Sequence, residues 1–108
     1  MTITYDEFRK IELRTARILE VEDIPGKDKL YKLSIEVGSE KRTLVAGIKQ
    51  WYSKEELKGK MIVIVANLEP KTLGGIESQG MLLAVDDANG NFSLVVAERP
   101  IDSGAAVR

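Results

Sequence analysis

The sequence predicts a small all-β domain, and three observations lead to that expectation. Apolar and polar residues alternate along several short segments, as they do in β-strands with one buried face. The segment 11–22 has the length of a long strand, but its apolar residues change face part-way along, as they do in a strongly bent strand. A short helical pattern at 53–58 separates three expected strands from two others. This order is typical of an OB-fold, a small, partly open β-barrel. An SH3-like barrel is the main alternative, and the intervening helix favours the OB-fold.

The composition indicates one globular domain with a single modest core. Of 108 residues, 44% are hydrophobic and 31% are charged, and the formal net charge of −1 indicates no particular partner. The chain contains no Cys and no His, which excludes disulfides, thiolate metal sites and Ser-His-Asp or Cys-His catalysis. Its N-terminus does not resemble a signal peptide, and no apolar run approaches the roughly 20 residues that cross a bilayer. We therefore expect a cytoplasmic protein with no membrane segment, cofactor or metal.

The N-terminal elements follow from capping and periodicity. Thr4 followed by Glu7 is a capping box, which predicts one or two helical turns over 5–10. The strand 11–22 comes next, and its change of phase predicts a bulge or a strong bend. A Pro-Gly pair within 23–29 marks a turn.

The middle of the chain gives the clearest strand. Between 31 and 37 the residues alternate between two faces, apolar Tyr31, Leu33, Ile35 and Val37 against polar Lys32, Ser34 and Glu36. A short connection at 38–41 leads to a third strand at 42–46. Ser53 and Glu56 form a second capping box and start the helix predicted at 53–58.

The C-terminal half contains three further apolar segments. The run 61–66 is apolar at consecutive positions, which predicts a strand buried on both faces. A fifth strand is expected at 81–85, and an Asn-Gly turn leads into a sixth at 92–97. On that last strand Phe92, Leu94 and Val96 share one face, which either a second copy or the chain's own barrel must cover. We expect one domain, 1–108, with a core at about 8–86 and a C-terminal extension, 87–108, involved in dimerisation.

The connection between the fourth and fifth strands is longer than a hairpin requires. A tight hairpin uses two to five linking residues, whereas 67–80 is long, polar and rich in glycine. In OB-folds this loop and the loop between strands one and two flank the ligand face. Asn67, Ser78 and Gln79 could donate or accept hydrogen bonds there, and Lys71 could contact a phosphate. The alternative interpretation is an ordinary surface loop.

Basic residues give a second, weaker indication. Cations on the first three strands and the first loop could form a track for a nucleic-acid backbone: Arg14, Arg17, Lys27, Lys29, Lys32 and Arg42. Lysines on a solvated turn are the alternative. Aromatic residues are few, at 6%. We expect Tyr31 in the core and Trp51-Tyr52 as a plug at one barrel end, so recognition should depend on shape and loops.

Three long segments resemble the tRNA-binding domain that is appended to methionyl-tRNA synthetases and also occurs in free-standing tRNA-binding proteins. They are IELRTARILEVEDIPGKDKLYKLSIEVG, RTLVAGIKQWYSKEELKGKMIVIVANLEP and GGIESQGMLLA. The resemblance covers about 8–86, and the combination of D-K-L-Y, N-L-x-P and S-x-G-M is specific. It implies an OB-fold, homodimerisation and binding of tRNA by its folded shape. A separate short chain of this kind is most similar to a small β subunit of methionyl-tRNA synthetase.

The resemblance also assigns candidate residues. Matching loop positions are Asn67, Pro70, Lys71, Ser78, Gly80 and Met81, and Lys29 and Tyr31 lie in D-K-L-Y. Where the family often has basic residues, this chain has Glu69, Thr72 and Gly74, and these departures remove phosphate contacts. Together with the basic track, the candidate tRNA-binding residues are Lys29, Lys32, Arg42, Asn67, Lys71, Ser78, Gln79 and Met81.

A protein-interaction protein and an enzyme are the alternatives to a non-catalytic tRNA-binding module. The weakened basic loop is also compatible with a dimeric protein-interaction or chaperone-like protein that binds RNA weakly or not at all, since OB scaffolds bind many ligands. An enzyme is disfavoured, because neither His nor Cys is present. In addition, adjacent carboxylates such as Asp86 and Asp87 point to opposite faces of a strand.

Overall fold

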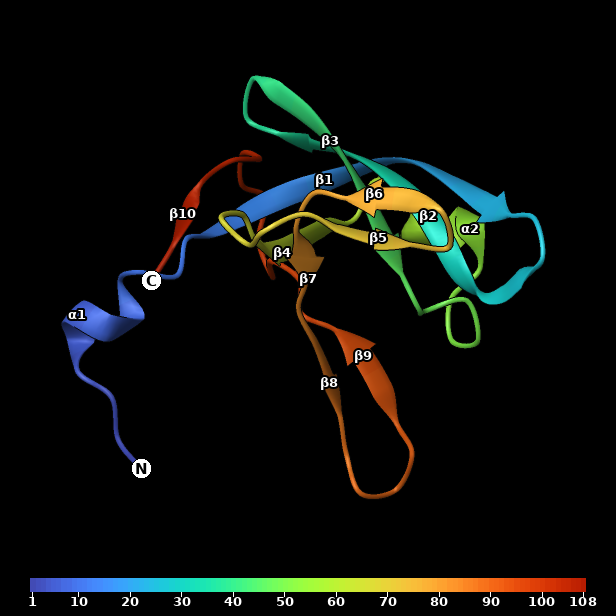
Figure 1. The fold of residues 1–108 in the computed structure, drawn as a ribbon. Helices are drawn as coiled ribbons and strands as arrows, with labels where there is room; N and C mark the ends of the chain where they lie inside the picture. Colours follow the sequence, from blue (N-terminus) through green and yellow to red (C-terminus); the bar gives the residue numbers. More distant parts are fainter.

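Short strands and two single-turn helices form the structure, a computed structural model that describes all 108 residues (Figure 1). In chain order the elements are α1 (Tyr5–Phe8), β1 (Leu13–Ile24), β2 (Lys27–Val37), β3 (Glu40–Ala46), α2 (Lys54–Leu57), β4 (Met61–Val65), β5 (Lys71–Leu73), β6 (Ile76–Ser78), β7 (Met81–Leu82), β8 (Ala84–Asp86), β9 (Phe92–Leu94) and β10 (Ala106–Val107). Both predicted capping boxes are confirmed, Thr4 with Glu7 and Ser53 with Glu56. Neither helix has the length and apolarity that crossing a membrane requires.

The main sheet has the order β3-β2-β1-β4-β7, and every pairing in it is antiparallel. One edge of β1 pairs with β4 through Leu13–Arg17, and the other pairs with β2 through Arg17–Ile24. The register shifts between Ile18 and Glu20, so Leu19 is the extra residue of a bulge. The predicted bulge is therefore confirmed, and it explains why the apolar residues of this strand change face.

The core lies between the inward faces of β2, β3 and β4. Burial alternates along 31–37 as predicted, and the three central residues of β4 are all buried. Leu57, fully buried on α2, closes one end of this core. The predicted all-β fold is confirmed, and this strand order, with a helix between β3 and β4, is compatible with the predicted OB-type barrel.

The strand predicted at 31–37 begins earlier, at Lys27. Two predicted strands of the C-terminal half are also wrong in their extent. The segment 81–85 forms two strands, because at Leu83 the chain leaves β4 and begins to pair with β9. The strand predicted at 92–97 ends at Leu94, and beyond it Val96 forms a bridge to Ile62 of β4. The hairpin of β8 and β9 projects from the sheet (Figure 1).

The C-terminal segment returns to β1. β10 pairs with Leu13 and Arg14, on the stretch of the β1 edge that β2 leaves free. Buried Thr15 fastens this segment, because its hydroxyl donates to the carbonyl of Asp102 at 2.7 Å and accepts from the amide of Ala105 at 3.0 Å. The tail is thus bound to its own domain by hydrogen bonds that satisfy a buried hydroxyl.

Candidate nucleic-acid interface

The long connection 67–80 contains a regular hairpin. β5 and β6 pair from Lys71 opposite Ser78 to Leu73 opposite Ile76. The two turn residues, Gly74 and Gly75, have φ of 59° and 81°. Two consecutive positive φ values are typical of a type I′ hairpin turn, which residues with a Cβ adopt at a cost. Glycines here therefore serve to make a tight turn.

The tip of this hairpin contacts the turn between β1 and β2. A Cβ added to Gly74 would lie 3.2 Å from Cδ1 of Leu30 and 3.5 Å from Cγ of Lys27. β6 itself contacts β3, because the amide of Val45 donates to the hydroxyl of Ser78 at 3.0 Å. The tip of the hairpin therefore lies beside the strand residues next to the β1–β2 turn, and in OB-folds both of these connections flank the ligand face. This contact also explains why position 74 carries no side chain.

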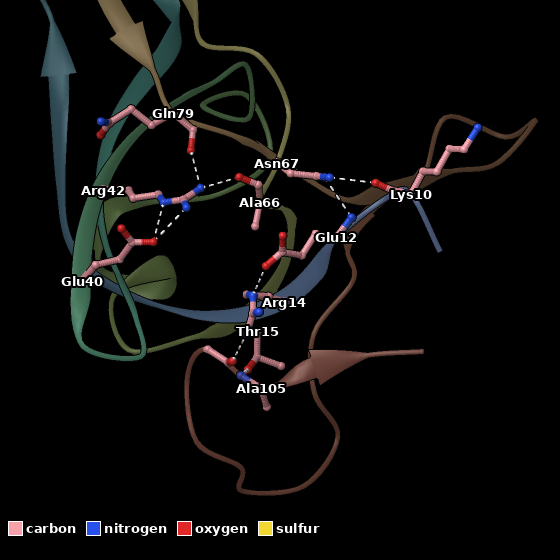
Figure 2. Close-up of polar contacts among 11 residues, drawn as sticks. Lys10, Glu12, Arg14, Thr15, Glu40, Arg42, Ala66, Asn67, Gln79 and Ala105 are labelled. Atoms are coloured by element: carbon pink, nitrogen blue, oxygen red, sulfur yellow. Dashed lines mark hydrogen bonds and ion pairs between the residues drawn. The ribbon is translucent and has the colours of Figure 1, made fainter. Parts of the chain in front are cut away.

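The base of the same connection is held by Arg42. Its Nη1 donates to the carbonyl of Ala66 at 2.6 Å and to the carbonyl of Gln79 at 3.3 Å. Its Nε and Nη2 donate to one carboxylate oxygen of Glu40, at 3.0 and 2.8 Å (Figure 2). One guanidinium therefore joins the residues that enter and leave the connection. Its hydrogen bonds give Arg42 a positioning role within the chain.

Two further predicted site residues, Asn67 and Ser78, also form hydrogen bonds within the chain. Asn67 accepts from the amide of Glu12 at 2.8 Å and donates to the carbonyl of Lys10 at 2.7 Å (Figure 2). The hydroxyl of Ser78, a residue only 4% exposed, accepts from the amide of Val45 at 3.0 Å.

Gln79 binds β3 as a strand would. Its amide donates to the carbonyl of Thr43 at 2.8 Å, and its side-chain oxygen accepts from the Thr43 amide at 2.9 Å. The main sheet is not one closed ladder, and this segment crosses the gap between β3 and β7. Direct contact of these polar residues with tRNA stays a prediction.

Asp23 neutralises two other cations beside the β1–β2 turn. Its carboxylate oxygens lie 2.8 Å from Nζ of Lys49 and 2.5 Å from Nζ of Lys54. Hydrogen bonds from Lys49 and then Lys54 hold the pKa of Asp23 below its ordinary value, and the bond to Asp23 raises the pKa of Lys54. The positive charges of Lys49 and Lys54 are therefore both balanced by the carboxylate of Asp23.

Trp51 and Tyr52 have different environments. Tyr52 is half-buried against the core, accepts at its hydroxyl from the amide of Leu94 at 3.0 Å, and fits the predicted plug. Trp51 is 44% exposed, and its ring stacks on Phe92 with centroids 4.2 Å apart. The prediction that Trp51 plugs one end of the barrel is therefore wrong. The alternation of residues carries no signal for its exposure, because the ring lies on an irregular segment between β3 and α2.

Comparison with known proteins decides the family. The model of the family described as "Putative tRNA binding domain" matches residues 13–106. The chain belongs to this tRNA-binding domain family. It is 50% identical over 106 residues to the methionine–tRNA ligase of Pyrococcus horikoshii, covering 98% of the chain and 14% of the ligase. The chain thus spans about 14% of the length of this curated relative.

Two solved structures resemble the tRNA-binding domain over nearly their whole length. A MetRS-related protein from Pyrococcus horikoshii has a TM-score of 0.94 and 36% identity, covering 100% of this chain and 99% of that one. The CsaA chaperone protein from Picrophilus torridus has a TM-score of 0.88 and 31% identity, covering 99% of this chain and 100% of that one. The resemblance inferred from the residue motifs is confirmed.

In this tRNA-binding domain the unpaired cations are the candidates for phosphate contact. Lys29 and Lys71 are exposed, Lys32 is half-exposed on the outward face of β2, and none of the three forms an ion pair. Lys27 is also exposed and unpaired, beside the hairpin tip. Met81, the remaining predicted residue, is 49% exposed on β7. The predicted set therefore divides into four residues that form hydrogen bonds at the ends of the 67–80 segment and four whose side chains form no bond within the chain.

Proposed function

We propose that this chain is a non-catalytic tRNA-binding module that acts in trans as an accessory or β subunit of a methionyl-tRNA synthetase. It binds tRNA by its folded shape with little sequence preference, and it raises the concentration of tRNA near a catalytic subunit. Its partners are tRNA, that catalytic subunit and a second copy of the chain. The similarity to the MetRS-related protein from Pyrococcus horikoshii, which is matched over nearly its whole solved chain, supports this role.

One observation carries the proposal: a rigid hairpin presents unpaired lysines on both sides of a loop contact. The hairpin is held at its base by Arg42 and at its tip by the turn beside Lys27. Lys71 lies at the start of β5, on the order of 10 Å from that tip at the usual rise per strand residue. Cations in fixed positions attract phosphates whatever the base sequence, which favours recognition of shape over sequence.

Binding is tested by titrating the purified protein with folded bulk tRNA at two salt concentrations. We expect tighter binding to folded tRNA than to a single-stranded RNA of equal length, and a linear fall of log K with log salt. The double variant Lys29→Ala/Lys71→Ala should bind more weakly, whereas Arg9→Ala/Lys58→Ala, which removes the same charge elsewhere, should match the wild type. Absence of tRNA binding at low salt would refute the proposal.

Action in trans needs its own experiment. Added to the catalytic subunit of a methionyl-tRNA synthetase, the protein should lower the KM for tRNA and leave kcat unchanged, because it supplies ground-state binding only. The Lys29→Ala/Lys71→Ala variant should lose this effect. If the wild type binds tRNA but leaves KM unaltered, the module is not an accessory subunit of that enzyme.

The proposed homodimer is supported by apolar side chains that the chain leaves exposed. Beside Leu94, which packs into the chain's own core, the C-terminal half exposes Val85, Val96 and Ile101, between 46% and 58%. A second copy would cover these side chains. We expect Val85→Glu/Ile101→Glu to sediment as a monomer and Ile3→Glu, an exposed apolar residue at the other end of the chain, to leave the assembly unchanged. Wild-type protein that sediments as a monomer at micromolar concentration would exclude the dimer.

The similarity to the CsaA chaperone protein supports a second candidate function. In this alternative the exposed apolar residues bind unfolded polypeptide, and RNA binding is weak or absent. Suppression of aggregation of a reduced, unfolded protein, with no retention of tRNA at low salt, would favour it. Binding of tRNA without any effect on aggregation would exclude it.

A further inference from the structure

Trp51 is an exposed aromatic ring with a second ring behind it. It is the only tryptophan of the chain and is 44% exposed. Its ring stacks on Phe92 of β9 with centroids 4.2 Å apart and planes 16° apart. Tyr52 meets the same Phe92 ring edge-on, with centroids 6.5 Å apart. An aromatic side chain of this size is normally covered, so its exposure needs an explanation.

The ring is held in place by main-chain bonds on both sides. The amide of Trp51 donates to the carbonyl of buried Ile48 at 3.0 Å. The next carbonyl, that of Tyr52, accepts from the Tyr31 hydroxyl at 2.8 Å, and the Tyr52 hydroxyl accepts from Leu94 at 3.0 Å. The platform is therefore ordered before anything binds, which lowers the entropy cost of binding.

The surroundings of the ring are charged. Lys49 and Lys54, which are both paired with Asp23, flank it in sequence, and the amide of Lys49 donates to the carbonyl of Lys29 at 3.4 Å. This bond places the segment beside Lys29 of β2, which forms no ion pair. No other large apolar residue of the segment 47–60 is exposed. A single exposed ring near an unpaired lysine does not resemble the contiguous apolar patch of a protein interface.

We propose that Trp51, backed by Phe92, is a stacking platform for one unpaired nucleobase of the bound tRNA. A flat ring beside cations is the arrangement by which proteins bind unstacked bases, because the ring stacks on the base while the cations contact the neighbouring phosphates. Folded tRNA carries such bases in its loops and at its 3′ end. This inference rests on the proposed tRNA binding and adds a contact that the lysines cannot make.

Fluorescence of the single tryptophan tests the platform directly. Folded tRNA should quench Trp51, whereas inorganic polyphosphate, which supplies charge without bases, should bind without quenching it. Trp51→Phe should keep its affinity for tRNA within about twofold, and Trp51→Leu should lose roughly 5- to 160-fold, the range for one stacked base. Tyr5→Leu, which removes an exposed aromatic ring from α1, is the matched control and should bind normally.

The outcomes separate this inference from the proposed function. If Trp51→Leu binds tRNA as tightly as the wild type while Lys29→Ala/Lys71→Ala loses affinity, the platform is refuted and tRNA binding stands. If Trp51→Leu sediments differently from the wild type, the ring belongs to an interface between copies, and the platform is again refuted. Thermal unfolding of each variant shows whether a loss of affinity reflects a loss of folding. If the wild type binds no tRNA at low salt, the proposed function itself fails.

Discussion

Gln79 and Thr43 exchange two hydrogen bonds, although Gln79 belongs to no strand and Thr43 lies in β3. The amide of Gln79 donates to the Thr43 carbonyl at 2.8 Å, and the Gln79 side chain accepts from the Thr43 amide at 2.9 Å. Two residues along the same strand, the amide of Val45 donates to the hydroxyl of Ser78 at 3.0 Å. Side-chain oxygens thus take the place of strand carbonyls along β3. This substitution satisfies an edge that a closed ladder would otherwise cover.

Replacing Ser78 by Ala should destabilise the protein. The amide of buried Val45 would lose its acceptor, and a buried unsatisfied donor costs about 1–3 kcal/mol in the free energy of unfolding. Denaturant titration measures this loss. Ser34→Ala is the control, because Ser34 lies on the outward face of β2 and its side chain forms no hydrogen bond within the chain. A Ser78→Ala variant as stable as the wild type would show that water or a local shift replaces this bond.

The sequence predicted the regular part of this fold because regular strands have a period. Alternation along 31–37 placed β2 and its buried face, and two capping boxes placed the helices. The bulge in β1 was predicted from a conflict of phase, and the structure places it at Leu19. Each of these patterns involves only residues close together in the sequence, so it can be recognised without knowledge of the tertiary contacts.

The roles of the site residues could not be predicted in the same way. Ser78, Gln79 and Arg42 are polar residues beside a long loop, and only the tertiary structure shows that each one bonds to main chain from another element. The same applies to Trp51, whose exposure depends on where the β8–β9 hairpin lies. Local patterns locate a loop, but they do not show which of its side chains remain free for a ligand.

Replacing Lys71 by Ala should weaken tRNA binding in a salt-dependent way. Loss of one phosphate contact lowers the slope of log K against log salt by about one unit, and it should do so equally for different tRNA species. Lys58→Ala is the matched control, because this exposed lysine is already paired with Glu20 at 3.3 Å. Titrations at four or more salt concentrations give the slope. An unchanged slope for Lys71→Ala would remove this residue from the interface.

Replacing Gly104 by Ala should release the C-terminal segment from β1. A Cβ at Gly104 would lie 2.6 Å from the amide nitrogen of Gly38, which no main-chain atom can accept without moving. Gly90→Ala is the control, because Gly90 also has a positive φ, 83° against 77°, but has no atom within 4 Å of an added Cβ. Both variants carry the backbone strain of a left-handed conformation, on the order of 1 kcal/mol, and only Gly104→Ala adds the clash.

Hydrogen exchange distinguishes the two glycine variants. In Gly104→Ala we expect faster exchange of the Ala105 amide, which donates to the hydroxyl of Thr15 at 3.0 Å, and a lower free energy of unfolding than in Gly90→Ala. Equal protection of this amide in both variants would mean that the tail does not depend on the close approach of the two glycines.

Asp23 should make stability depend on pH on the acid side. Its pKa is held below the ordinary value of 3.8, chiefly by the hydrogen bonds from Lys49 and Lys54. A carboxylate with a depressed pKa stabilises the folded state above its unfolded-state pKa, and this contribution is lost as the pH falls through the folded-state pKa. The pKa of Lys54 is raised above 10.5 by the same pair, so its contribution is lost only as the pH rises through that higher value. The ion pairs therefore stabilise the folded state fully between pH 3.8 and pH 10.5, the ordinary pKa values of the two groups.

Asp23→Asn tests the pairing in two independent ways. Unfolding measured between pH 2 and 6 should show a shallower acid limb than in the wild type, with the remainder due to Glu56 and Asp87, whose pKa values are also lowered. The substitution also frees the ammonium groups of Lys49 and Lys54 beside the candidate interface. It should therefore tighten tRNA binding and steepen its salt dependence, since two uncompensated cations become available to phosphates. An altered acid limb with unchanged tRNA affinity would confirm the ion pairs and place both lysines outside the RNA contact.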